Sequence, residues 1–111
     1  MSDRLPSHIE AKALLRQAQS RGGFSMLLHR GDRDQGAILL VLRTFTGESS
    51  VCERLPQVAG AARWSLVNPK DIQTDQGLNE YLMRRVTQDP DLWTIELTVP
   101  EVERFVSDLS S

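Results

Sequence analysis

The most apolar stretch of the chain is Ala37–Leu42, six apolar residues in succession. A strand with one exposed face alternates apolar and polar residues, whereas a strand covered on both faces reads as a continuous apolar run. The pattern therefore predicts a central strand. A second strand candidate, Phe24–Arg30, precedes it and is separated from it by residues 31–36. Because so short a connection favours antiparallel neighbours, we expect residues 24–30 and 37–43 to pair as a hairpin.

The segment that joins these two strands has the composition of a tight turn. Gly31 and Gly36 bracket it, and glycine adopts the positive φ angles that tight turns require. Asp32 and Asp34 lie between them, and Asp carboxylates accept hydrogen bonds from nearby backbone N–H groups. We therefore expect a turn that is stabilised by its own side chains.

Three stretches carry the apolar spacing of amphipathic helices. The first begins at Ser7, which with Glu10 has the spacing of a capping box, and its apolar stripe is Ala11, Leu14, Leu15 and Ala18. The second follows the candidate cap Thr74, and its stripe is Leu78, Tyr81, Leu82 and Val86. The third begins at Pro100, and its stripe is Val102, Phe105, Val106 and Leu109.

Three further strands complete the predicted fold. Val51–Leu55 and Arg63–Val67 are candidates separated by a loop at 56–61, and Trp93–Val99 alternates as a strand buried on one face. The order of elements predicts an α+β fold with a small, mainly antiparallel sheet. An N-terminal helix, a helix before the last strand and a short C-terminal helix accompany that sheet. The length of 111 residues predicts a single domain, 1–111.

Two segments resemble the signatures of a known family. They are Arg30-Gly31-Asp32-Arg33-Asp34-Gln35-Gly36-Ala37 before an aliphatic strand, and Asp89-Pro90-Asp91-Leu92-Trp93 before an alternating strand. Both are similar to segments of a family of small alphaproteobacterial proteins of unknown function. The N-terminal helix also fits, so the resemblance covers most of the chain. The resemblance implies no catalytic residues, and it implies strand and turn over residues 100–109, where the apolar pattern predicts a helix.

Composition narrows the possible functions. The net charge is −2, whereas nucleic-acid-binding domains carry a strong basic excess, so no nucleic acid is expected as a partner. No apolar run approaches the roughly 20 residues of a membrane helix, so no membrane is expected either. Cys52 is the one cysteine, and a single cysteine forms neither an intrachain disulfide nor a Cys-based zinc site. These features favour a cytoplasmic location.

The candidate ligand-binding residues are His29, Arg30, Asp32 and Asp34. The order Asp32-x-Asp34 begins like a calcium loop, but Arg43 occupies the twelfth position, where such loops carry a glutamate, so we expect no metal. His29 with either aspartate would provide a base and its orienting partner, but no nucleophile accompanies them. No nucleotide-binding motif is present, so neither catalytic residues nor cofactors are predicted.

Three functions from different classes remain open. The favoured one is a small cytoplasmic binding or assembly module without catalytic activity, because it requires no motif. The second is an enzyme with a site at the His29–Asp34 turn. The third is a weak nucleic-acid binder that uses basic residues of the N-terminal half, Arg4, Lys12, Arg16, Arg21, Arg30 and Arg33. The sequence identifies no small-molecule ligand.

The assembly hypothesis includes a homodimer, formed through an exposed sheet edge or through the apolar C-terminal segment. Charged residues discourage an edge strand from pairing with another chain, and Val51–Leu55 carries Glu53 and Arg54. The segment from Trp93 onward is apolar along both its strand and its helix. We therefore expect the C-terminal segment to form the interface of the dimer.

Overall fold

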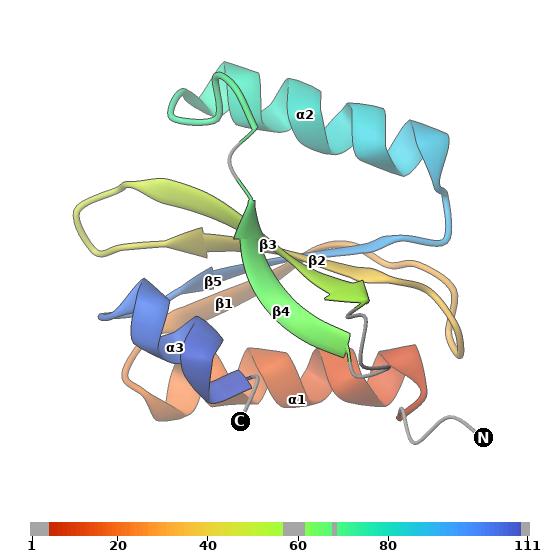
Figure 1. Ribbon diagram of the computed structural model, residues 1–111, viewed down its shortest axis with the longest axis horizontal. Helices are drawn as coiled ribbons and strands as arrows, with labels where there is room; N and C mark the ends of the chain where they lie inside the picture. Colours follow the sequence, from red (N-terminus) through yellow and green to blue (C-terminus); the bar gives the residue numbers. More distant parts are fainter. Residues whose placement is uncertain (1–4, 57–61, 68, 110–111) are drawn as a thin grey trace.

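The computed structural model describes residues 5–56, 62–67 and 69–109. Of the predicted loop at 56–61, Pro56 is the last residue of a strand and the other residues lie outside the described ones. The elements in chain order are α1 (Ser7–Ser20), β1 (Phe24–His29), β2 (Ile38–Arg43), β3 (Ser49–Pro56), β4 (Ala62–Val67), α2 (Asp75–Gln88), β5 (Trp93–Thr98) and α3 (Val102–Leu109). The strands form one sheet, with α1 and α3 on one face and α2 on the other (Figure 1). The predicted α+β class and its mainly antiparallel sheet are confirmed.

The order of strands in the sheet is β1-β5-β2-β3-β4. β5 lies between β1 and β2, antiparallel to the first and parallel to the second, so the predicted hairpin of 24–30 with 37–43 is wrong. Two strands on either side of a third lie about 10 Å apart. The six-residue segment 31–36 reaches up to about 20 Å when extended and spans that gap easily. A segment of this length can therefore join two paired strands or two strands that are separated by a third. Here β5 lies between β1 and β2.

β2 is covered on both faces, as its continuous apolar sequence predicts. Ile38, Leu40 and Leu42 pack in the cluster formed with α1 and α3, and Leu39 and Val41 pack in the cluster formed with α2. β5 is more deeply buried than its alternating sequence predicts. Thr94, on the polar face of that strand, is buried as well, so the prediction of a single buried face is wrong there.

The first turn of α1 is fixed by the segment 31–36. Pro6 is the N-cap and no side chain caps the helix, so the predicted capping box is wrong. The Ser7 hydroxyl instead donates to the carbonyl of Gly36 at 2.6 Å. The backbone N–H of His8 donates to the carbonyl of Arg33 at 2.9 Å. Carbonyls of the turn thus accept from N–H groups that have no partner within the helix.

β3 is an interior strand, between β2 and β4, so the expectation that Glu53 and Arg54 protect a free edge is wrong. The two charged side chains point to opposite faces, as successive residues of a strand do. Arg85 of α2 makes two hydrogen bonds to the Glu53 carboxylate, at 2.6 and 3.0 Å. Arg54 pairs with Glu10 of α1, and its guanidinium lies 4.6 Å from the centre of the Trp64 ring. Each charge therefore ties one helix to the sheet.

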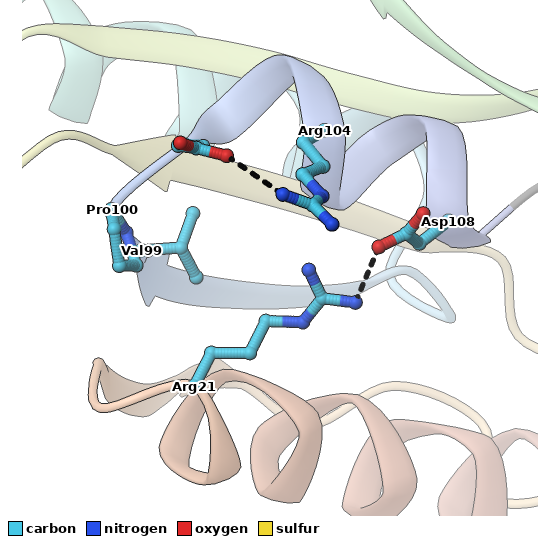
Figure 2. Close-up of a pocket in the computed structure, with 6 residues that line it drawn as sticks. Arg21, Val99, Pro100, Arg104 and Asp108 are labelled. Carbon is cyan, nitrogen blue, oxygen red and sulfur yellow. Dashed lines mark hydrogen bonds and ion pairs between the residues drawn. The ribbon is translucent and has the colours of Figure 1, made fainter.

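Residues 102–109 form the helix that the apolar pattern predicts, and the strand and turn implied by the family resemblance are not found there. Phe105 and Val106 are buried, and Val102 and Leu109 pack against the same cluster. Arg21, just after α1, reaches toward α3 and pairs with Asp108 at 2.8 Å (Figure 2). The same guanidinium lies 5.1 Å from the centre of the Phe105 ring. The chain itself therefore covers the apolar surface of its C-terminal segment.

Candidate functional site

The two segments that carry the family resemblance, residues 30–37 and 89–93, lie against each other in the fold. The backbone N–H of Asp32 donates to the carbonyl of Asp91 at 2.9 Å, and that of Trp93 donates to the carbonyl of Ala37 at 2.8 Å. The indole N–H of Trp93 donates to the carbonyl of Asp32 at 2.6 Å. The turn between β1 and β2 is thus bonded to the start of β5, the strand that separates them.

Gly31 and Gly36 are required for close packing rather than for positive φ angles. Among the described glycines, only Gly22 and Gly47 have positive φ, so the expectation for these two is wrong. A Cβ at Gly31 would lie 2.0 Å from the carbonyl oxygen of Asp91, and one at Gly36 would lie 2.2 Å from the same atom. Any side chain at either position would push the turn away from β5.

The carboxylate of Asp32 stabilises the turn, as expected. Its Oδ2 accepts from the backbone N–H groups of Asp34 and Gln35, at 3.1 and 2.8 Å. Asp34 is exposed, and its carbonyl accepts from the backbone N–H of Ser7 at 3.2 Å. Both aspartates therefore have structural contacts within the turn, and neither lines a pocket described below.

His29 and Arg30, the other two candidates, line different pockets. His29 Nδ1 lies 2.8 Å from the carbonyl of Leu92, so this nitrogen carries the proton and donates it. The ring faces α2, beside Thr94. The Arg30 guanidinium lies 5.8 Å from the centre of the Trp93 ring, in a pocket next to α1. The four predicted residues thus lie close in the chain without converging on one site.

The pocket of His29 is an open groove of about 470 Å³ between β1 and α2. Its lining is mainly apolar and consists of Leu28, His29, Asn79, Leu82, Met83, Val86, Thr87 and Thr94. A β-bulge between Leu27 and His29 brings the end of β1 into this groove. Bulges redirect side chains at sheet edges, and this one turns His29 to the face of the sheet that carries Thr94.

The pocket of Arg30 is smaller, about 230 Å³, and basic. It is lined by His8, Lys12, Arg30, Gly31, Arg33 and Trp93. None of these residues is acidic. The sequence predicts Arg30 as a candidate ligand-binding residue, whereas it places Lys12 and Arg33 only in the basic N-terminal half of the chain. The fold gathers all three with His8 at one end of α1.

Cys52, the one cysteine of the sequence, is buried in the core. Burial, together with the neighbouring charge of Glu53, raises the pKa of its thiol to about 12. The thiol is therefore protonated at neutral pH and does not serve as a partner for His29. In the part of the chain that the structure describes, no group of three or more His, Cys, Asp or Glu side chains is arranged to hold a metal ion.

A family model described as "Protein of unknown function (DUF1491)" matches residues 5–107. The chain belongs to the DUF1491 family. The resemblance inferred from the sequence is therefore confirmed at the level of the family. No curated protein matches the chain. Among the residues described, no helix of this DUF1491 protein has the length and apolar character needed to span a bilayer.

Solved structures share the fold. A crystal structure of a DUF1491 protein from Caulobacter crescentus CB15 is 25% identical, has a TM-score of 0.76, and is matched over 88% of this chain and 91% of that chain. An NMR structure of a DUF1491 protein from the same organism is 25% identical, with a TM-score of 0.74 and 93% of each chain covered. The solution structure of protein Atu0922 from A. tumefaciens is 24% identical, with a TM-score of 0.73 and 88% of each chain covered.

Proposed function

We propose that this DUF1491 protein is a non-catalytic assembly module of the cytoplasm that forms a homodimer by pairing the free edge of β1 with the same edge of a second copy. The observation that carries the proposal is the apolar, uncharged character of that edge. The exposed fractions are 68% for Phe24, 57% for Met26, 40% for Leu27 and 39% for Leu28. Soluble proteins protect an edge strand with charges or a covering element, and an apolar exposed edge is a site of association.

The opposite edge strand, β4, is less uniformly apolar, since its sequence includes Arg63 and Ser65. α3 packs on one face of β4. β1 has contacts with α1 on one face, while Phe24 and Met26 lie on the other face, opposite the residues that pack with α1. The bulge at Leu28 is the one protective feature of β1, and it affects only the end of the strand.

A second copy fits this edge because the surface is self-complementary. Phe24 forms an edge-to-face pair with Phe45, with ring centres 6.2 Å apart, at the start of β1. The apolar groove beside α2 lies at the other end of the strand, on the face that Phe24 shares with His29. Antiparallel pairing about a two-fold axis places the start of one β1 next to the end of the other. The aromatic pair of each copy then faces the groove of its partner.

This interface replaces the one expected from the sequence. The sequence predicts the interface at the C-terminal segment, because the strand and the helix of that segment both carry apolar side chains that need cover. Trp93, Ile95, Leu97, Val99 and Phe105 are buried by the chain itself, so that reason no longer applies. Homodimer formation and the cytoplasmic location remain parts of the proposal, the latter supported by the single cysteine.

Light scattering coupled to size exclusion tests the proposal. We expect a dimer mass at tens of micromolar for the natural chain and a monomer mass for Met26→Lys, because a buried lysine opposite its own copy is strongly unfavourable. The matched control is Ile9→Lys, which changes an exposed apolar residue on α1 and should leave the dimer intact. A monomeric natural chain, or a Met26→Lys variant that remains a dimer, would overturn the assignment.

A further inference from the structure

We propose that the basic pocket at the start of α1 binds a phosphate group carried by a small molecule. Three segments supply its charges: His8 and Lys12 from α1, Arg30 from the end of β1, and Arg33 from the turn. Arginine binds phosphate through paired N–H groups, and lysine binds it as a point charge. The lining is thus made of the residue types that recognise phosphate.

The electrostatics of the pocket distinguish it from another hollow that arginines line, the groove drawn in Figure 2. In the groove of Figure 2 each arginine has a carboxylate of its own: Arg21 pairs with Asp108 at 2.8 Å, and Arg104 with Glu101 at 3.7 Å. Over residues 5–56, 62–67 and 69–109, no such pair joins a carboxylate to Lys12, Arg30 or Arg33. The basic pocket therefore has an uncompensated positive potential, and an anion supplies the missing charge.

The backbone around the pocket is held in place before any ligand binds. His8 Nδ1 lies 3.1 Å from the carbonyl of Arg33, and the backbone N–H of His8 donates to the same oxygen. Lys12 follows His8 by one helical turn and so lies on the same side of α1. Trp93, whose ring lies beneath the Arg30 guanidinium, is fixed by its bond to Asp32. A site that is already ordered requires little reorganisation on binding.

Size and surroundings define the class of ligand. Pockets for drug-sized molecules have volumes of about 300–1,000 Å³. This pocket, at about 230 Å³, fits a phosphate group and a few attached atoms but not a whole nucleotide. A nucleic acid needs an extended basic stripe, whereas this chain is acidic overall and the pocket gathers only four basic side chains, those of His8, Lys12, Arg30 and Arg33. A small phosphomonoester therefore matches the site.

Isothermal titration with inorganic phosphate, glycerol phosphate and a short RNA tests the inference at constant ionic strength. We expect saturable binding of glycerol phosphate, weaker binding of inorganic phosphate, and at least tenfold weaker binding to Lys12→Gln and Arg33→Gln. The matched control is Arg84→Gln, which removes a guanidinium on α2 that lies near Tyr81 and should leave binding unchanged. Lys12 is exposed on α1, so its variant keeps the test valid even if Arg33→Gln disturbs the turn.

Three results would overturn the inference. The first is the absence of saturable binding of both phosphate compounds. The second is equal weakening in Arg84→Gln and Lys12→Gln, which would indicate a general charge effect. The third is tighter binding of the RNA than of glycerol phosphate, which would indicate a nucleic-acid surface.

Discussion

The indole N–H of Trp93 donates a 2.6 Å hydrogen bond to the carbonyl oxygen of Asp32. Trp93 is the first residue of β5, and Asp32 lies in the turn that links β1 to β2. A buried tryptophan needs a partner for its N–H, and here the partner belongs to the segment that must pass over the end of β5. This bond, with the backbone bonds beside it, holds β5 between the two strands.

Gly31→Ala should destabilise the fold, because the new Cβ would lie 2.0 Å from the carbonyl oxygen of Asp91. Backbone atoms cannot move away as the tip of a flexible side chain can, so the turn must shift and lose its bonds to β5. We expect the free energy of unfolding to fall by about 1–3 kcal/mol, as for overpacked sites. Denaturation in urea measures this change.

The control for that experiment is Gln35→Ala, an exposed position of the same turn. Substitutions at such surface positions change the free energy of unfolding by about 0.5 kcal/mol or less. If Gly31→Ala lowered the free energy of unfolding as little as Gln35→Ala does, the turn would not be closely packed on β5.

The pair of Glu53 and Arg85 should contribute more to stability than an exposed pair does. Both side chains are partly buried, Arg85 bonds to both carboxylate oxygens, and its pKa is raised chiefly by those hydrogen bonds. A double-mutant cycle of Glu53→Gln and Arg85→Gln should give a coupling free energy of about 1–3 kcal/mol. The same cycle on the exposed pair Glu101 and Arg104 should give less than about 1 kcal/mol. Equal coupling free energies for the two pairs would contradict the expectation that burial strengthens the pair of Glu53 and Arg85.

Cys52 should be unreactive in the folded protein. With a pKa raised to about 12 by burial, about one thiol in ten thousand is ionised at pH 8. A chromogenic disulfide reagent at that pH should therefore react slowly with the native chain and rapidly once urea unfolds it. Fast reaction of the native chain would indicate that the β3 side of the core is open.

The sequence predicted the helices and strands more accurately than it predicted which strands pair. The continuous apolar run of β2 required cover on both faces, and the helical stripes placed α1, α2 and α3 correctly. Strand pairing was less accessible, because apolar periodicity reports which faces are buried and not which strand lies beside which. Whether β5 enters between β1 and β2 depends on contacts between the turn and residues 89–93, which are distant in the sequence.

The candidate site shows the same limit. Arg30 was singled out from the sequence, but His29, its neighbour in the chain, faces a different pocket. Lys12 and Arg33 join Arg30 only because the first turn of α1 is bonded to the carbonyls of the turn. The spacing of His8 and Lys12, one helical turn apart, is the only local signal for this cluster.

Hydrogen exchange along β1, measured by NMR on dilute and concentrated samples, tests the central claim of edge pairing most directly. β1 bonds to β5 on one side, and the account predicts that the amides on its other side gain protection as the concentration rises. In Met26→Lys that concentration dependence should disappear while the β5-bonded amides keep their protection. Outward amides of β1 that exchange rapidly at every concentration, or concentration-dependent protection confined to α3, would contradict the account.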